Sequence, residues 1–209
     1  MVDKISSWKY AEEFSKEPAV ITRARQRADE LGVESVTAAT GSHLAVLVGA
    51  LNAKAVVEVG TGAGVSGLWM LLANDTCVLA TIETESEYQE LAKLAFDQAG
   101  IASSRLRLIN GKSSEVLANL ADAAYDLVLL DGDKETLMQQ VRESFRLLRP
   151  GGVLAIAHAL WRDRVPDNGL SDETTMVYRN VLELLSNSED FITTLSPIGD
   201  GLLLATKRT

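Results

Sequence analysis

The feature that most constrains this chain is a series of alternate glycines at the end of an apolar segment. The segment ends at Gly60, and Gly62 and Gly64 follow before a helical pattern begins. A second apolar run further along the chain ends in Glu83. A buried strand, a glycine turn, a helix and a second strand ending in a carboxylate form the unit with which α/β folds bind a nucleoside. The sequence therefore predicts a nucleoside site at this turn.

The position of a carboxylate indicates which nucleoside derivative the turn binds. A GxGxxG pattern starts at Gly62, two residues later than in a dinucleotide fold, because the chain already turns at Gly60. Glu58, just before the turn, would repel a pyrophosphate but suits a ligand with an ammonium and a sulfonium group, such as S-adenosylmethionine. Backbone N–H groups at the helix start can bind its carboxylate, and Glu83 can accept hydrogen bonds from both ribose hydroxyls. A structural turn without a ligand is the alternative for this segment alone.

Composition limits the other function classes. With 209 residues the chain is long enough for one domain, and we expect a helical cap over residues 1–53 and an α/β core over residues 54–209. A net charge of -9 opposes binding to nucleic-acid phosphates. The apolar runs fall short of the about 20 residues that a membrane helix needs, and no signal peptide is evident. We therefore expect a cytoplasmic protein that acts on small molecules, with no membrane or nucleic-acid partner.

The pattern of apolar residues predicts a parallel sheet covered by helices on both faces. Three helices are expected first, over residues 3–15, 18–31 and 42–51. Strands are then expected over residues 54–60, 77–83, 105–109, 125–131 and 152–158. The helices between and after them are expected over residues 65–74, 85–99, 112–120, 134–148 and 172–185. Because the carboxyl ends of parallel strands share one edge, the site belongs at that edge.

The end of the chain departs from an all-parallel sheet. Two strand-like runs, over residues 191–195 and 202–206, are separated by Pro197 and by Gly199-Asp200-Gly201, which is typical of a hairpin. A hairpin here makes the seventh strand antiparallel, as in class I methyltransferases and unlike NAD enzymes.

Five separate blocks resemble the cation-dependent O-methyltransferases, the family that includes catechol and caffeoyl-CoA O-methyltransferases and many bacterial relatives. The blocks are Val57-Glu58-Val59-Gly60-Thr61 with Ser66, Asp131-Gly132-Asp133-Lys134, Leu148-Arg149-Pro150-Gly151-Gly152-Val153, Leu160-Trp161-Arg162-Asp163-Arg164-Val165 and Pro197-Ile198-Gly199-Asp200-Gly201-Leu202. They occur in the family's order, and the similarity covers residues 37–207. The resemblance implies a Rossmann-like, seven-stranded class I methyltransferase sheet, S-adenosylmethionine as cofactor, a small hydroxylated acceptor with aromatic molecules among the candidates, and a homodimer.

The resemblance also implies roles for individual residues. The cofactor-binding positions are Val36, Glu58, Gly60, Thr61, Gly62, Ser66, Glu83, Ser113 and Asp131. Among them, the backbone of Val36 would cover the methionyl group, Glu83 would bind the ribose, and Ser113 would lie beside the adenine.

The catalytic block contains one departure from the family. In the family the residue at Asp131 binds a divalent cation, the residue at Lys134 can act as a general base, and an Asp-Asn pair completes the metal site. Here Ala157 and His158 replace that pair. Mg²⁺ requires oxygen ligands in octahedral geometry, so we predict that Mg²⁺ dependence is lost and that no metal binds, with Asp131 as a ligand only if an altered site holds a softer metal.

Without a cation, methyl transfer to a hydroxyl requires a general base, and Asp131, Lys134 and His158 are the predicted catalytic residues. His158 either removes the proton or fills the former cation pocket, and Lys134 either acts as base or forms a structural ion pair. Asp131 is expected near the sulfonium. Two further residues, Arg162 and Arg164, suit a planar or anionic acceptor together with Trp161, unless this aromatic side chain only holds a surface loop.

Two other functions remain open at this level. One is a degenerate relative that binds S-adenosylmethionine or S-adenosylhomocysteine without turnover, favoured by the loss of the Asp-Asn pair. The other is an NAD(P)-dependent oxidoreductase, which the position of Glu58 and the terminal hairpin disfavour.

Overall fold

The computed structural model describes residues 3–209 and has one seven-stranded sheet with the strand order β3-β2-β1-β4-β5-β7-β6. The strands are β1 (Ala55–Val59), β2 (Val78–Glu83), β3 (Leu106–Asn110), β4 (Tyr125–Leu130), β5 (Leu148–Ile156), β6 (Phe191–Ser196) and β7 (Leu202–Lys207). The first five strands are parallel, and β7 pairs antiparallel with both β5 and β6. The predicted fold class, including the antiparallel terminal strand, is confirmed.

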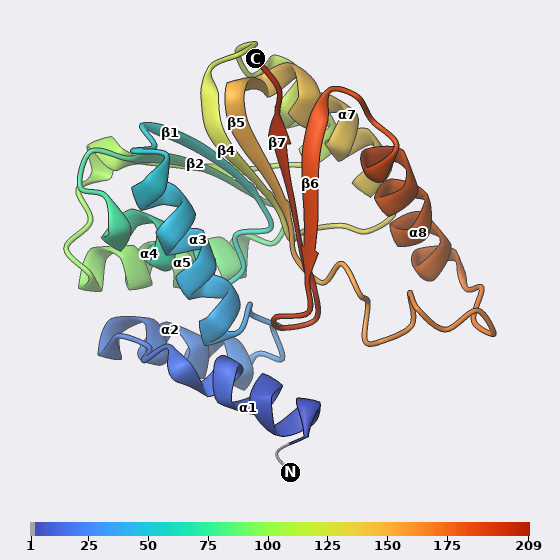
Figure 1. Ribbon diagram of the computed structural model, residues 1–209. Helices are drawn as coiled ribbons and strands as arrows, with labels where there is room; N and C mark the ends of the chain where they lie inside the picture. Colours follow the sequence, from blue (N-terminus) through green and yellow to red (C-terminus); the bar gives the residue numbers. More distant parts are fainter. Residues whose placement is uncertain (1–2) are drawn as a thin grey trace.

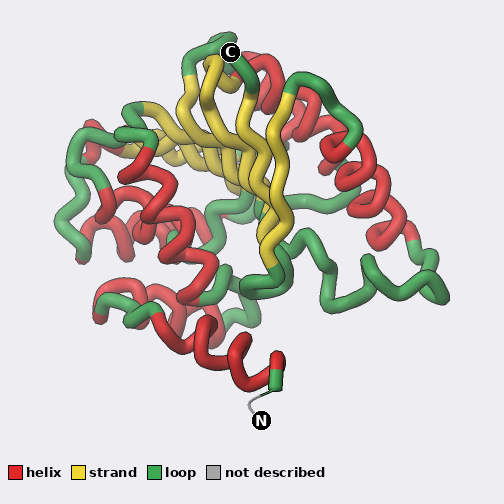
Figure 2. The backbone as a smooth tube through the Cα atoms, viewed as in Figure 1, coloured by secondary structure: helices red, strands yellow, loops and turns green. Residues whose placement is uncertain are grey.

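Helices cover both faces of the sheet (Figures 1 and 2). The α-helices are α1 (Lys4–Phe14), α2 (Ala19–Glu30), α3 (Ala38–Ala50), α4 (Val65–Ala73), α5 (Ser86–Gln98), α6 (Ser113–Val116), α7 (Leu137–Leu147) and α8 (Glu173–Ser186). Two short 3₁₀ turns are η1 (Ser103–Arg105) and η2 (Leu117–Asn119). In Figure 1, α3, α4 and α5 lie on one side of the sheet, and α7 and α8 lie on the other.

Alternate residues of the central strands supply two separate cores. Val56 of β1 and Leu127 of β4 pack with the helices α2 to α5, whereas Val57 and Val128, the next residue in each strand, pack with α7 and α8. Successive side chains of a strand point to opposite faces, so strands with apolar side chains on both faces must be covered on both sides. This arrangement leaves the carboxyl edge of the sheet as the place where polar side chains gather.

The amino-terminal helices lie beside that edge (Figure 1). Helix α3 packs closely on α4, because Gly41 faces Trp69 and a Cβ at Gly41 would lie 2.2 Å from the indole. Helix α3 begins at Ala38, since the Thr37 hydroxyl accepts a hydrogen bond from the backbone N–H of Thr40 and caps the helix. The predicted start at residue 42 was wrong, because this cap was not recognised.

Three other predicted elements differ from the structure by more than one residue. Strand β5 runs from 148 to 156 and not from 152 to 158, because its first residue pairs with Tyr125 ahead of a register shift. The helix expected over 134–148 begins at Leu137, and the one expected over 112–120 divides into α6 and η2. The change in β5 matters most, because it places His158 in the turn after the strand, with a left-handed φ of 54°.

Within residues 3–209, no helix combines the length and apolar character that crossing a membrane requires.

Candidate active site

The glycine turn joins β1 to α4 and lies against the end of β4. Gly60 has a φ of 94°, and a Cβ there would lie 2.4 Å from the carbonyl oxygen of Asp131. Gly64, also left-handed with a φ of 85°, is the N-cap residue of α4. Glycine is needed at both positions because L side chains rarely adopt these angles. The backbone can therefore pass close to β4 and present free N–H groups at the helix start.

Glu58 lies fully buried behind this turn. The Ser66 hydroxyl donates to its Oε1 at 2.5 Å, and the Thr81 hydroxyl donates to its Oε2 at 2.6 Å. The Thr81 hydroxyl also lies 2.6 Å from that of Thr61. Burial raises the pKa of Glu58 to about 7, against the lowering effect of the two hydroxyl donors. The carboxyl group lines none of the three cavities described below and instead fixes two hydroxyl side chains around the turn.

Two adjoining cavities follow the turn. The first, which we call the glycine-turn cavity, has a volume of about 300 Å³. Its wall includes these predicted cofactor-binding residues: Val36, Gly60, Thr61, Gly62, Ser66, Glu83 and Asp131. The second, the Ser113 cavity, has a volume of about 450 Å³ and contains Ser113 at the start of α6. Both cavities are lined by Gly60 and Glu83, so one elongated ligand could occupy them together.

Glu83 is held in a fixed orientation at the end of β2. Its Oε2 accepts a hydrogen bond from the backbone N–H of Gly62 at 2.9 Å. Its Oε1 accepts from the backbone N–H groups of Thr84 and Glu85, at 2.9 and 3.1 Å. A carboxylate has about four acceptor positions, and these three N–H groups occupy three of them, so one remains for a ligand hydroxyl.

A third cavity, the His158 cavity, has a volume of about 580 Å³ and lies between α1, the turn after β5 and the β6–β7 turn. Its apolar wall includes Trp8, Leu160 and Pro197. It shares the residues Glu34, Ser35 and Val36 with the glycine-turn cavity. The two cavities are therefore neighbours, separated by the segment between α2 and α3.

The ring of His158 lies between two carboxylates. Its Nε2 is 3.4 Å from Oδ1 of Asp131, which follows β4, and its Nδ1 is 3.3 Å from Oδ2 of Asp200, in the β6–β7 turn. Burial raises the pKa of Asp131, while His158 and Lys134 act in the opposite direction. Lys134 lines none of the three cavities described above, whereas His158 lines the third.

The contacts of the segment after His158 show which of its residues, Trp161, Arg162 and Arg164, face a cavity. Trp161 stacks on Tyr178 of α8 with ring centroids 5.5 Å apart, which supports the alternative that it holds the loop. Arg164 pairs with Asp172 at the start of α8 and lines none of these cavities. Arg162 does line the His158 cavity, where it pairs with Glu34 at 3.0 Å. Two guanidinium groups were expected at an anionic acceptor. Only that of Arg162 lines the cavity, and it is paired with Glu34.

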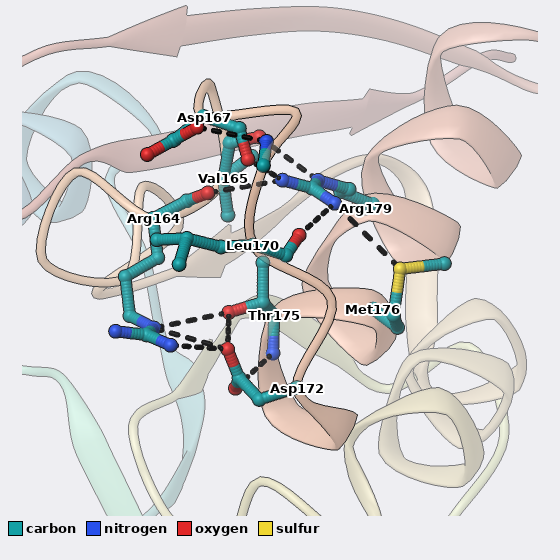
Figure 3. Close-up of polar contacts among 9 residues, drawn as sticks. Arg164, Val165, Asp167, Leu170, Asp172, Thr175, Met176 and Arg179 are labelled. Carbon is teal, nitrogen blue, oxygen red and sulfur yellow. Dashed lines mark hydrogen bonds and ion pairs between the residues drawn. The ribbon is translucent and has the colours of Figure 1, made fainter.

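One guanidinium group holds this loop on α8, as Figure 3 shows. Arg179 donates to the backbone carbonyl oxygens of Arg164, Val165, Asp167 and Leu170, at distances of 2.5 to 3.0 Å. The loop has no regular secondary structure, so these hydrogen bonds substitute for pairing within a helix or sheet.

The residues present do not fit a divalent cation of the kind that the family resemblance implies. Within residues 3–209, no three side chains of His, Cys, Asp or Glu are grouped so that they could hold a metal ion. The side chain of Ala157 has no ligand atom, and the Asp131 carboxylate faces the His158 ring. Octahedral Mg²⁺ would require oxygen ligands at these positions.

Sequence reasoning missed several residues of these sites. Asp200 was read as part of a hairpin turn, and Glu34 and Thr81 received no role. A threonine inside a buried strand was a usable signal for Thr81, because buried hydroxyls need partners. The contacts of Asp200 and Glu34 depend on segments more than 40 residues away in the chain.

Comparison with known proteins identifies the family. The sequence profile described as O-methyltransferase matches residues 11–208. This chain belongs to the O-methyltransferase family. A protein of Mycobacterium sp. (strain JLS) that is named as an O-methyltransferase is 46% identical over 199 residues, which cover 95% of this chain and 90% of the relative. A similarly named protein of Mycobacterium tuberculosis (strain H37Rv) is 44% identical over 203 residues, or 97% of this chain and 91% of the relative.

Solved structures support the same fold. A Corynebacterium glutamicum protein superposes with a TM-score of 0.88 and 30% identity, covering 96% of this chain and 95% of its own. The O-methyltransferase TomG from Streptomyces achromogenes, solved with S-adenosylmethionine, has a TM-score of 0.87 and 24% identity over the full length of both chains. The predicted O-methyltransferase family is thereby confirmed, and the oxidoreductase alternative loses its support.

Proposed function

We propose that this O-methyltransferase transfers a methyl group from S-adenosylmethionine to a hydroxyl group of a small acceptor, without a bound metal cation. The observation that carries the proposal is that the glycine-turn cavity and the His158 cavity share one wall. A donor in the first cavity and an acceptor in the second would meet where Asp131 and His158 lie. Methyl transfer from a sulfonium is an in-line displacement, so alignment across such a junction is the main requirement.

The donor fits the two cavities along the glycine turn. Its methionyl carboxylate would bind the N–H groups at the start of α4, with Thr61 and Ser66 beside it. A ribose hydroxyl would donate to Glu83, and the adenine would lie in the Ser113 cavity. Glu58 would contribute indirectly, by orienting the hydroxyl groups of Ser66 and Thr81.

His158 is the general base in this mechanism. The acceptor O–H bond breaks, its proton passes to the imidazole ring of His158, and the oxygen forms a bond to the methyl carbon as the carbon–sulfur bond breaks. The products are a methyl ether, S-adenosylhomocysteine and an imidazolium that later releases its proton to solvent. Asp131 and Asp200 flank the ring, and their carboxylates stabilise the imidazolium as it forms.

The charges of the His158 cavity favour a neutral or cationic acceptor over an anionic one. Its wall contains four carboxylates, Glu12, Glu34, Asp163 and Asp200, against the basic side chains of Lys9 and Arg162 and the ring of His158. Trp8 and Pro197 provide flat apolar surfaces, which suit an aromatic ring bearing the hydroxyl group.

A homodimer and a cytoplasmic location are further parts of the proposal.

A methylation assay with a panel of phenols and catechols tests this function. Activity should persist in EDTA, because the residues around Asp131 do not form a Mg²⁺ site. Activity that disappears in EDTA and returns with Mg²⁺ would refute metal independence.

The same assay tests the general base. His158→Ala should lower kcat by about 100-fold or more, the range for loss of a positioned base. His43→Ala is the matched control, because His43 lies on α3 with its Nδ1 3.0 Å from the Ala39 carbonyl oxygen and lines none of these cavities. Equal rates for the two variants would remove His158 from the mechanism.

The second candidate function is binding of S-adenosylmethionine or S-adenosylhomocysteine without turnover. It is favoured by the replacement of the Asp-Asn pair by Ala157 and His158. It predicts binding of S-adenosylhomocysteine with no turnover of any acceptor in the panel.

A further inference from the structure

Helix α1 forms one wall of the His158 cavity, although none of its residues 4–14, all of which the structure describes, is buried. Ile5, Trp8 and Glu12 follow one another at intervals of three and four residues, so they share one face of the helix, and all three line the cavity. Ile5 and Trp8 remain 72% and 48% exposed. A helix usually stays in place because it buries an apolar face, so α1 needs a different attachment.

Glu12 supplies such an attachment through both oxygens of its carboxylate. Its Oε1 accepts a hydrogen bond of 2.5 Å from the backbone N–H of Gly199, in the β6–β7 turn. Its Oε2 accepts a hydrogen bond of 3.1 Å from the hydroxyl group of Thr37, the N-cap residue of α3. One side chain therefore joins three elements that are distant in the sequence, and Figure 1 shows α1 beside the β6–β7 turn.

The two partners of Glu12 are held in place without α1. Gly199 has a φ of 60°, and a Cβ there would lie 2.5 Å from the hydroxyl oxygen of Thr40, so the β6–β7 turn packs directly on the first turn of α3. The Thr37 hydroxyl also accepts a hydrogen bond of 3.2 Å from the backbone N–H of Thr40. Glu12 therefore fixes α1 relative to a part of the structure that is already well defined.

The carboxyl end of α1 has a second attachment, because Ser15, the C-cap residue, donates a hydrogen bond of 2.8 Å to the Ser42 hydroxyl of α3. Trp8 lies one turn before Glu12, on the side away from Ser15, so its place in the cavity wall depends on Glu12. We propose that Glu12 is a positioning residue that docks α1 on the β6–β7 turn, and that Trp8 is a specificity-determining residue that contacts the ring of an aromatic acceptor. This inference rests on the proposed function.

Steady-state kinetics of Glu12→Ala test the docking. We expect KM for an aromatic acceptor of the panel to rise about 10-fold or more, because two hydrogen bonds to a charged group are lost. KM for S-adenosylmethionine should change by less than about threefold, since Ile5, Trp8 and Glu12 line only the His158 cavity. Glu13→Ala is the matched control, because Glu13 is the next residue of α1, lines none of these cavities and pairs only with the exposed Lys9.

Glu12→Gln separates positioning from simple charge attraction. Its amide oxygen can still accept from the Gly199 N–H, and its NH₂ group can donate to the Thr37 hydroxyl, which accepts as well as donates. We therefore expect this variant to keep KM for the acceptor within about threefold of the wild type. A rise as large as that of Glu12→Ala would overturn the positioning role, because the two variants share only the loss of charge.

Trp8→Ala tests the contact with the acceptor. Loss of the indole should raise KM for the aromatic acceptor by about 10-fold. Tyr10→Ala is the control, because Tyr10 is an aromatic residue of the same helix that lines none of these cavities. Equal KM values for the two variants would overturn the role of Trp8.

Hydrogen exchange of the backbone amides measures the attachment of α1 without an acceptor. Residues 4–14 should exchange about 10-fold faster in Glu12→Ala than in the wild type, while Glu12→Gln and Glu13→Ala should exchange at the wild-type rate. The sheet should exchange at the same rate in all four proteins. Wild-type exchange of α1 in Glu12→Ala, or faster exchange with an unchanged KM for the acceptor, would overturn the proposal.

Titration of the same samples with S-adenosylhomocysteine separates this inference from the proposed function. Failure of the wild-type protein to bind S-adenosylhomocysteine would refute the proposed function, whatever the exchange rates of α1. Normal binding and turnover, with a wild-type KM for the acceptor in Glu12→Ala, would refute only the role of Glu12. Binding without turnover of any acceptor would refute both the proposed function and the role of Trp8.

Discussion

The buried carboxyl group of Glu58 should make the stability of this protein depend on pH, and Glu58→Gln should remove that dependence. Its pKa is about 7 in the folded chain, against 4.5 for an ordinary glutamate. The folded state therefore binds this proton more tightly than the unfolded state does. The resulting stabilisation is fully present below pH 4.5 and is lost as the pH rises through about 7.

The size of the effect follows from the difference of about 2.5 pKa units, at about 1.4 kcal/mol each. The free energy of unfolding of the wild type should therefore fall by about 3 kcal/mol between pH 4.5 and pH 8, relative to Glu58→Gln. Comparing the two proteins cancels the contributions of the titrating groups that do not interact with Glu58, and only Asp131 and Glu83 act on its charge. In the variant, the Ser66 and Thr81 hydroxyls can still pair with the amide, because a hydroxyl both donates and accepts.

Urea unfolding of both proteins across this pH range measures the effect. Glu87→Gln, a change at an exposed glutamate of α5, is the control and should follow the wild type. The same pH dependence in the wild type and in Glu58→Gln would refute the reasoning that burial of this carboxyl group raises its pKa.

Three further predictions concern the turn, the loop and the core. Gly60→Ala should lower the free energy of unfolding, measured in urea, by at least about 3 kcal/mol, because position 60 has a positive φ and a Cβ there would overlap Asp131. Gly49→Ala, at a position with open space around it, should not lower the free energy of unfolding. Arg179→Gln should speed proteolysis within residues 162–171, with Arg179→Lys intermediate, because only the guanidinium reaches four carbonyl groups. Burial raises the pKa of the Cys77 thiol to about 11, so Cys77 should resist a thiol reagent at about pH 8 until urea unfolds the chain, and rapid labelling of the folded protein would contradict this.

The sequence predicted the parts of the fold that local patterns determine. Strands such as β1 and β4 are mostly apolar runs between turn residues, with one acidic residue in each, and position 60, where the backbone passes close to Asp131, is a glycine. The hairpin before β7 could be read from its proline and glycines. These signals lie within a few residues of one another, so a single sequence contains them.

Contacts between distant segments could not be predicted in this way. Glu58 was predicted to contact the ligand. In the structure it is buried and accepts hydrogen bonds from the hydroxyl groups of Ser66 and Thr81. The pairing of Arg162 with Glu34 depends on the path of two loops. The position of His158 between two carboxylates depends on the β6–β7 turn lying beside the end of β5, which no local pattern specifies.

The central claim is that the glycine turn and Glu83 bind S-adenosylmethionine. Calorimetric titration of the protein and of Glu83→Gln with S-adenosylhomocysteine, and of the protein with NAD⁺, tests it most directly. We expect S-adenosylhomocysteine to bind the wild type, Glu83→Gln to bind it about 10-fold or more weakly through the loss of charge-assisted hydrogen bonds, and NAD⁺ not to bind. Binding of NAD⁺ with no heat from S-adenosylhomocysteine would contradict the account.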